Sequence, residues 1–202
     1  MKHLASSLFT TLMIVVAAPS YAEVPPQEVV AMTTNSVMSE VRRQHDALAK
    51  NPQQLYRLVN KQLIPLIDFN RMSRWTLGKH WRRATPDQRK RFTEQFKTML
   101  VRTYANALLE FSNNRITYLP MAASPGATDV TVRTVVHLSG GPSIPVSYSL
   151  HLKDKKWLAY DINIDGISLI ANYRSSFASQ MRRDDLDTLI SMLEKRNHSL
   201  IK

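Results

Sequence analysis

The spacing of hydrophobic residues divides the chain into a helical first part and a strand-rich second part. In residues 27–113 apolar residues recur every three or four positions, as on one face of an α-helix. In residues 115–164 hydrophobic and polar residues alternate, as in strands with two unlike faces. The three- and four-residue spacing returns after Gly166. We therefore expect a helical part, then a sheet, then C-terminal helices over 166–198.

Proline and capping residues divide the helical part. We expect an amphipathic helix over 27–50, because Pro52 fits the first turn of a new helix but not the interior of a continuing one. After a short second helix, Asp68 is a suitable N-cap for a helix over 69–77, and Gly78 is a suitable C-cap. Three helices are therefore expected before the next start signal.

The clearest helix start in the chain is Thr85-Pro86-Asp87-Gln88. Threonine is a good N-cap, proline suits the first helical position, and Gln88 stands where it can complete a capping box. The apolar stripe that follows continues to Asn113. We expect one long helix over this interval.

Four strands are expected in the second part, joined by short turns rich in glycine, proline and charged residues. Short links between strands produce an antiparallel meander. One face of each strand is apolar, while the other carries residues such as Arg133, Ser149 and His151, so we expect one covered and one solvated face. The expected strands are 116–119, 128–138, 143–153 and 155–164.

Runs of helices followed by an antiparallel sheet are typical of the α+β class. We expect helices packed on one face of a curved four-stranded antiparallel sheet, enclosing a deep apolar cavity. The lining would come from the long helix, the strands and the C-terminal helix, although each of these side chains could equally belong to a solid core. The candidate residues for this lining, and so for binding whatever apolar ligand the cavity holds, are Leu100, Tyr104, Leu108, Val132, Val136, Val146, Tyr148, Leu150 and Tyr173.

The first 22 residues have the three parts of a secretory signal peptide. Lys2 is followed by an apolar run over 8–18, and the segment ends in the small-x-small sequence Ser20-Tyr21-Ala22. A retained membrane anchor is the alternative, but the run is about half as long as the roughly 20 residues that span a bilayer. We expect cleavage after Ala22, and a mature chain over 23–202 that folds as one domain.

The formal net charge is +11, and the excess is concentrated in one segment. Between Arg71 and Arg102 ten basic residues stand against two acidic ones. Such a field indicates an anionic partner, although a merely solvated face is the alternative. Because several charges adjoin the positive N-terminus of the long helix, we expect reversal of Arg89 and Arg91 to raise the melting temperature slightly. The candidate docking residues are Arg82, Arg83, Arg89, Lys90 and Arg91.

Catalytic and metal-binding motifs are missing from the sequence. It has no cysteine, so disulfides and thiolate ligands are excluded. Its six histidines do not form H-E-x-x-H, and no nucleophile elbow or phosphate-binding glycine loop is present. Asp161 and Asp165 could form an acid/base or calcium pair, but a structural hydrogen bond and a turn at Asp165-Gly166 are simpler roles. We expect no catalytic residue, no metal and no cofactor.

Two sequence blocks resemble one protein family. The first runs from Trp157 to Phe177 and contains Tyr160-Asp161, Asp165-Gly166, Ser168-Leu169 and Asn172-Tyr173-Arg174. The second contains Leu77-Gly78-Lys79-His80-Trp81-Arg82, then Ala84 to Arg89, then Phe92, Phe96, Leu100, Thr103-Tyr104 and Leu108. Together they resemble the periplasmic phospholipid-shuttle family of the Mla (maintenance of lipid asymmetry) ABC pathway, also described as the toluene-tolerance or MlaC-type component.

This resemblance implies a cystatin- or NTF2-like α+β fold with extra helices and a lipid cavity. It implies a carrier in the periplasm whose cargo is a phospholipid, moved between the outer and inner membranes. The implied partners are an inner-membrane ABC transporter complex with an MCE-domain subunit and an outer-membrane lipoprotein-porin complex. Nothing in the sequence suggests a permanent interface, so we expect a monomer, and export argues against nucleic acid as a partner.

Two other functions are consistent with parts of the sequence. An NTF2-like isomerase or dehydratase would use Asp161 or Tyr148 in an apolar cavity, but only fold analogy favours it. A basic nucleic-acid-binding protein rests on charge alone and would show steep salt dependence. Lipid binding needs no catalytic group, because burial of the acyl chains alone supplies the binding free energy. Two acyl chains have about 30 methylenes, and each favours burial by roughly 0.8 kcal/mol. A lipid carrier is the leading hypothesis.

Overall fold

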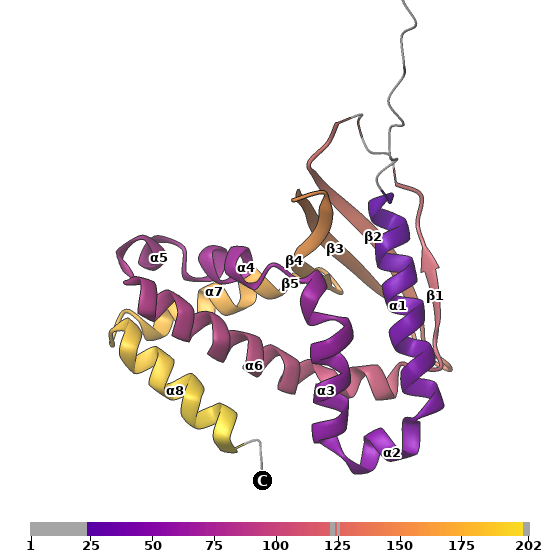
Figure 1. The fold of residues 1–202 in the computed structure, drawn as a ribbon, viewed down its shortest axis with the longest axis horizontal. Coiled ribbons are helices and arrows are strands. Elements are labelled where there is room, and N and C mark those ends of the chain that lie inside the picture. The colour runs from indigo at the N-terminus through magenta and orange to yellow at the C-terminus, as the bar shows by residue number, and fades with distance from the viewer. Residues whose placement is uncertain (1–23, 122–123, 125, 200–202) are drawn as a thin grey trace, which may run out of the picture.

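The computed structural model describes residues 24–121, 124 and 126–199. The expected leader, residues 1–22, lies outside the described residues. The sheet and α1 (Pro26–Arg43) stand at one end of the molecule and α5 (Lys79–Arg83) at the other, and α6 (Pro86–Glu110) runs between them (Figure 1). The remaining helices are α2 (His45–Lys50), α3 (Pro52–Gln62), the 3-10 turn η1 (Ile64–Leu66), α4 (Phe69–Leu77), α7 (Leu169–Gln180) and α8 (Leu186–Ser199).

The first helical stretch is broken where one continuous helix was expected. Gln44 leaves the helical conformation (φ −114°, ψ 19°), so α1 ends at Arg43 and α2 begins at His45. Leu48 of α2 is then buried in the same cluster as Val41 of α1. Burial of a leucine side chain contributes about 1.5–3 kcal/mol, which offsets the interruption of the helix. The prediction of one helix over 27–50 is therefore wrong at residue 44.

The predicted caps of α4 and α6 are confirmed. Asp68 Oδ1 accepts a hydrogen bond from the Arg71 amide over 2.8 Å, and α4 has Gly78 as its C-cap residue. Thr85 and Gln88 form the complete capping box: the Gln88 amide donates to Thr85 Oγ1 over 3.2 Å, and the Thr85 amide donates to Gln88 Oε1 over 3.0 Å. The short helix α5 between α4 and α6 was not predicted.

The sheet has five strands rather than four, in the order β1-β2-β3-β4-β5, and every neighbouring pair is antiparallel. The additional strand, β5, stands where the C-terminal helix was expected to begin. Asp165 and Gly166 both have positive φ (51° and 81°), the geometry of a tight two-residue hairpin turn that brings β5 back along β4. The strands are β1 (Arg115–Tyr118), β2 (Asp129–His137), β3 (Ile144–Lys153), β4 (Lys156–Ile164) and β5 (Ile167–Ser168).

The first helix, α1, covers part of one face of the sheet. Val132 of β2 and Leu150 of β3 point to this face and are buried together with Val30 of α1. The opposite face, expected to be solvated, is exposed at Arg133, but His151 on it is buried. His151 is covered because the segment before α4 pairs with β4 and brings Asp68 against it. The prediction of a wholly solvated face is therefore wrong where α4 begins.

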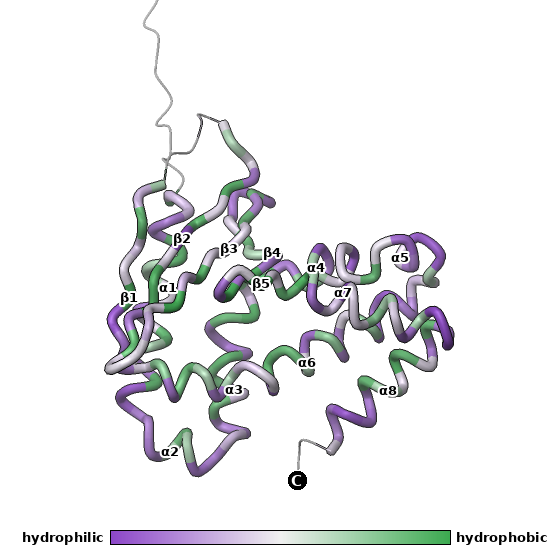
Figure 2. Tube along the Cα trace, turned by 180° about the vertical axis from the view of Figure 1, so that it is seen from behind, coloured by the Kyte–Doolittle hydropathy of each residue, from purple (hydrophilic) through white to green (hydrophobic). Residues whose placement is uncertain are grey.

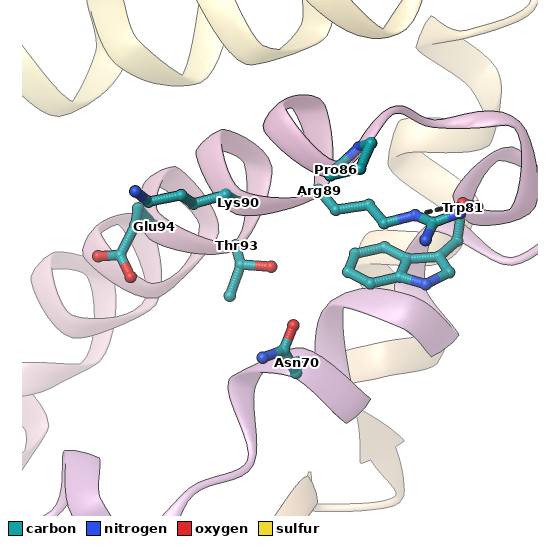
Figure 3. Close-up of a pocket in the computed structure, with 7 residues that line it drawn as sticks. All are labelled: Asn70, Trp81, Pro86, Arg89, Lys90, Thr93 and Glu94. Atoms are coloured by element: carbon teal, nitrogen blue, oxygen red, sulfur yellow. Dashed lines mark hydrogen bonds between the residues drawn. The ribbon is translucent and has the colours of Figure 1, made fainter.

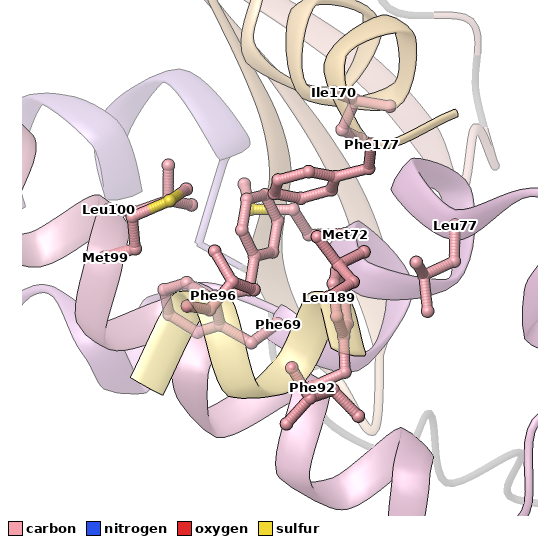
Figure 4. Packing of buried hydrophobic residues seen from close by; sticks show 12 residues of the cluster. Phe69, Met72, Leu77, Phe92, Phe96, Met99, Leu100, Ile170, Phe177 and Leu189 are labelled. Carbon is pink, nitrogen blue, oxygen red and sulfur yellow. The ribbon is translucent and has the colours of Figure 1, made fainter. Parts of the chain in front are cut away.

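Buried apolar side chains form three separate clusters. The first joins α4, α6, α7 and α8 around Phe92 and Phe96 (Figure 4). The second joins α1, α2, α3 and the second half of α6 around Val41 and Leu55, and the third lies between α1 and the sheet around Val132. Hydrophobic and hydrophilic residues alternate along the strands and along α6 (Figure 2), so each element gives one face to a cluster. α6 belongs to the first two clusters and connects them.

Candidate functional site

One end of the sheet carries apolar side chains that lie outside the three clusters. Val136 of β2 is paired with Ile144 of β3. Val146 of β3 is paired with Ile164 of β4. Directly paired residues of antiparallel strands point to the same face, which here is the face that α1 covers further along. The sheet-end patch, as we call it, consists of half-buried residues of the described chain that belong to none of the three clusters: Val136, Ile144, Val146, Ile162 and Ile164.

Three of the nine candidate lipid-binding residues are core residues in this structure. Leu100 packs in the first cluster, and Val132 and Leu150 pack in the third. Their exposed fractions are 7%, 0% and 2%, respectively. A side chain buried to this degree among its neighbours has little surface left for a ligand. Contact of these three with lipid stays a prediction, and their burial favours the alternative of plain core.

The other six candidates lie where the clusters end. Val136 and Val146 belong to the sheet-end patch. The remaining four are half-buried side chains that pack against the margin of a cluster: Tyr104 and Tyr173 at the first, Leu108 at the second and Tyr148 at the third. A ligand that lies between the clusters would meet these six side chains before it met the three core residues.

Burial favours the uncharged form of two tyrosine hydroxyls at these margins, those of Tyr148 and Tyr173. The pKa of Tyr173 is raised to about 12, mainly by burial and further by the neighbouring Tyr104 hydroxyl. Burial also raises the pKa of Tyr148, while the Thr134 hydroxyl acts in the opposite direction. A neutral tyrosine contacts apolar chains along its ring and makes a hydrogen bond at its hydroxyl. These margins therefore suit an amphiphile better than a charged metabolite.

Two hollows on the described surface lie elsewhere. One, of about 410 Å³, lies between α4, α5 and α6. The other, of about 240 Å³, lies beside the start of α1 and includes Trp157. None of the nine candidate lipid-binding residues lines either hollow.

The five candidate docking residues differ in how freely they can meet a partner. Arg82, Arg83 and Lys90 are exposed. Arg89 is held in place, because its guanidinium lies 5.4 Å from the centre of the Trp81 ring and its Nε donates to the Trp81 carbonyl over 3.0 Å. The exposed three are therefore the stronger candidates for docking.

Arg91 is the centre of an ion-pair network that the sequence did not predict. Its guanidinium lies 2.9 Å from the carboxylate of Asp187 and 3.6 Å from that of Glu194, both on α8. A third carboxylate, of Asp87 on α6 itself, lies 3.8 Å away. These contacts fasten α8 to α6. For Arg91 these ion pairs favour the opposite of the expected rise in melting temperature on charge reversal.

The sequence matches known proteins over most of its length. It matches the family described as MlaC protein over residues 31–195. The chain belongs to the MlaC protein family. Its relative in Pseudomonas putida, described as toluene tolerance protein ttg2D, is 33% identical over 168 residues, which are 82% of this chain and 78% of that protein.

A second relative and a solved structure agree with this assignment to the MlaC family. The intermembrane phospholipid transport system binding protein MlaC of Haemophilus influenzae is 20% identical over 190 residues, 93% of this chain and 89% of that protein. The phospholipid-binding protein from Ralstonia solanacearum, solved in complex with a phospholipid, is 32% identical with a TM-score of 0.81, over 88% of this chain and 99% of that chain. The predicted α+β class and the family resemblance are confirmed.

The acidic pair of this MlaC-family chain has the structural roles that were the simpler alternative. Asp161 Oδ1 accepts hydrogen bonds from the amides of Ile162 (2.9 Å) and Ile170 (3.1 Å). Asp161 Oδ2 accepts from the Ser168 hydroxyl over 2.6 Å. This carboxylate ties β4 to the start of α7, and Asp165 begins the tight turn between β4 and β5.

A buried histidine–aspartate pair was not visible in the sequence. His151 Nε2 lies 3.0 Å from Asp68 Oδ2, and both side chains are buried. Such a pair acts as a general base only where its histidine reaches a substrate. Here the His151 ring packs edge-on against Tyr160, with ring centres 5.8 Å apart, and Asp68 also caps α4. The pair therefore joins α4 to the sheet.

The described part of this MlaC-family chain has neither a cluster of candidate metal ligands nor a helix suited to spanning a membrane. No three histidine, cysteine or acidic residues among the described positions are grouped so that they could hold a metal ion. None of the described helices combines the length and the hydrophobicity that crossing a bilayer requires.

Sequence reasoning missed three members of the sheet-end patch as site residues. Ile144, Ile162 and Ile164 lie on the apolar faces of their predicted strands, so their alternation gave a signal. The pattern does not say which of these apolar residues other elements pack against. That packing decides which residues become core and which stay half-buried.

Proposed function

We propose that this protein is a periplasmic carrier that holds a phospholipid by its acyl chains and moves it between the outer and inner membranes. This transport would maintain the lipid asymmetry of the outer membrane. The observation that carries the proposal is the sheet-end patch, whose apolar side chains are half-buried and belong to none of the three clusters. The relative from Ralstonia solanacearum with the same fold holds a phospholipid, which supports the same cargo for this chain.

The energetics of lipid transfer favour such a patch. Two acyl chains have on the order of 30 methylenes, and each favours burial by roughly 0.8 kcal/mol, so a lipid cannot cross an aqueous compartment at a useful rate unprotected. A carrier must therefore offer the chains an apolar surface. We propose that they lie along the sheet-end patch and are flanked by the margin residues Tyr104, Leu108, Tyr148 and Tyr173.

The proposal includes how the carrier reaches its compartment and its partners. Residues 1–22 would direct export and be removed, and 23–202 would act as a single lipid-binding domain and a monomer. The partners would be an inner-membrane ABC transporter complex with an MCE-domain subunit and an outer-membrane lipoprotein-porin complex. The exposed Arg82, Arg83 and Lys90 would contribute to docking, mainly by accelerating association at low salt.

We propose a binding role without catalysis. The alternative enzyme would use Asp161 or Tyr148, yet Asp161 already accepts three hydrogen bonds within the fold. Burial keeps Tyr148 protonated, because its pKa is raised, so its hydroxyl is a poor general base. Asp161 is therefore engaged within the fold, and Tyr148 is unsuited to act as a base.

The carrier proposal is tested by what co-purifies with the protein. Protein prepared from a bacterial periplasm without detergent should carry phospholipid, detected by native mass spectrometry and by solvent extraction. It should also transfer a fluorescent phospholipid between two vesicle populations. Protein that contains no phospholipid under these conditions and transfers none would overturn the proposal.

A further inference from the structure

The hollow between α4, α5 and α6 has the features of a binding groove. Its volume of about 410 Å³ falls within the roughly 300–1,000 Å³ of ligand clefts. α4, α5 and the first turns of α6 lie toward the end of the molecule away from α1 and the first strands (Figure 1), so the groove does not belong to the sheet-end patch. The residues that line it are Asn70, Trp81, Pro86, Arg89, Lys90, Thr93 and Glu94 (Figure 3).

Thr93 forms an inner, polar part of this groove. Its side chain is 8% exposed, and its Oγ1 is buried without a hydrogen-bond partner among the described residues. The hydroxyl points away from α6 into the groove (Figure 3). Buried polar atoms in native proteins are nearly always paired, so an unpaired one needs an explanation. A ligand that hydrogen-bonds to Thr93 supplies it.

The opposite wall offers a second hydrogen-bonding group. Asn70 on α4 is exposed, and its amide points across the groove toward Thr93 (Figure 3). A side-chain amide has both donors and an acceptor, and so does a hydroxyl. Together they match a peptide group, which also presents one donor and one acceptor.

The rim of the groove is positive and carries an aromatic surface. Lys90 is exposed, and no ion pair among the described residues includes it. The one carboxylate on the rim, Glu94, is paired with Lys97. Trp81 is half-buried beneath the Arg89 guanidinium. A ligand therefore meets the positive charge of Lys90 at one end of the groove and the indole of Trp81 at the other (Figure 3).

A phosphate headgroup fits these groups less well than a peptide does. Phosphate is bound where several donors converge. Arg89 Nε and Nη2 already donate to the carbonyls of Trp81 and Arg82, over 3.0 and 3.4 Å. The phosphate oxygens of a headgroup only accept hydrogen bonds, whereas Asn70 and Thr93 offer acceptors as well as donors. A ligand with both donors and acceptors therefore uses the groove more fully.

We propose that this groove binds an extended segment of a partner protein that carries an acidic side chain. The acidic side chain pairs with Lys90, a peptide group hydrogen-bonds to Asn70 and Thr93, and a neighbouring side chain packs on Trp81. A partner bound here leaves the sheet-end patch free. The idea that this partner supplies or receives the cargo rests on the proposed carrier function. Binding of a peptide segment in the groove does not depend on that function.

The test uses two groove variants and one matched control. Thr93→Val removes the hydroxyl at nearly constant shape and, because that hydroxyl is unpaired, should leave stability unchanged or raise it. Lys90→Glu reverses the free charge. Lys50→Glu makes the same reversal at an exposed position on α2, away from the groove. All three variants are compared with the wild type as purified full mature chains.

The probe is a phage-displayed library of random heptapeptides, selected on the wild-type protein. We expect enriched sequences that contain aspartate or glutamate. A synthetic copy of an enriched peptide should bind Thr93→Val and Lys90→Glu at least about tenfold more weakly than wild type, and Lys50→Glu equally well.

Three results would overturn the proposal. One is the absence of any enriched acidic sequence, and a second is unchanged peptide affinity for Thr93→Val. The third is binding of phosphatidylglycerol vesicles that Lys90→Glu abolishes, with no peptide selected, which assigns the groove to headgroups instead. Lipid content is measured separately: a wild type without phospholipid refutes the carrier proposal and leaves the peptide result standing.

Discussion

A tryptophan in place of Val146 is the sharpest test of the sheet-end patch. Val146 is half-buried and lies outside all three clusters of the described chain. An indole at this position extends over the patch, where the acyl chains are proposed to lie. We expect Val146→Trp to lose most of its co-purified phospholipid while the protein stays folded.

The magnitudes follow from where each valine lies. Val132, on the same face four residues from Val136, is 0% exposed inside the third cluster, so Val132→Trp should overpack it and lower the free energy of unfolding by about 1–3 kcal/mol. Leu150→Trp should behave in the same way, because Leu150 is 2% exposed in that cluster. Val146→Trp should change the free energy of unfolding by less than about 1 kcal/mol. An indole that displaces about five methylenes removes about 4 kcal/mol of lipid burial.

The assay pairs urea denaturation with quantification of extracted phospholipid. Ser147→Trp is the matched control, because Ser147 is the next residue of β3 and points to the opposite face. That variant should keep both its lipid and its stability. If Val146→Trp unfolds as readily as Val132→Trp, or if it retains its full lipid content, the assignment of the patch to lipid binding is refuted.

Three further predictions concern single side chains. Asp161→Asn should lower the free energy of unfolding by about 1–3 kcal/mol without changing lipid content, since one oxygen of a three-bond acceptor becomes a donor; unchanged stability with lost lipid would contradict this. Because the pKa of Tyr173 is raised to about 12, the native state binds more protons than the unfolded state between about pH 10 and 12, so stability falls as pH rises through that window. Tyr173→Phe should make this fall shallower in thermal melts from pH 9 to 12, and an unchanged slope would argue against it. Arg91→Glu should lower the melting temperature, because it places a fourth carboxylate among three and lowers the free energy of unfolding by about 1 kcal/mol or less at this partly exposed site; a higher melting temperature would show that the helix dipole dominates.

Features set by neighbours in the sequence could be predicted. The capping box of Thr85 and Gln88 involves residues three apart, and the Asp68 cap reaches only to Arg71. Alternation of apolar and polar residues likewise marks four strands, because the pleat repeats every two residues whatever packs on it. These parts of the fold are local, and their signals are correspondingly strong.

Features set by distant residues could not be predicted. Asp68 and His151 are 83 residues apart, and Arg91 and Asp187 are 96 apart. The strand β5 has only two residues and is defined by its pairing with β4, so it leaves no alternation in the sequence. The most consequential case is β2, where Val132 and Val136 have the same residue type and share a face, yet only Val132 is buried in a cluster with α1. Hydrophobicity alone cannot distinguish these two valines, and would place both in the core or both in a binding site.

The division of the core into three clusters bears on how a carrier can release its cargo. A void of about 400 Å³ left inside one continuous core would cost about 10 kcal/mol at roughly 24 cal/mol per Å³. That cost is comparable with the whole stability of a typical domain, about 5–15 kcal/mol, so an emptied carrier of that design would unfold.

In this chain each cluster closes without a ligand, and hydrogen bonds within the protein join the elements around it. Asp68 joins α4 to β3 through His151, Asp161 joins β4 to α7, and Asn197 joins α8 to the Gln95 carbonyl of α6 over 2.9 Å. Loss of lipid would expose the half-open patch to water but would leave these contacts in place. The empty and loaded states can therefore share one fold, which is the condition for a carrier to bind and release repeatedly.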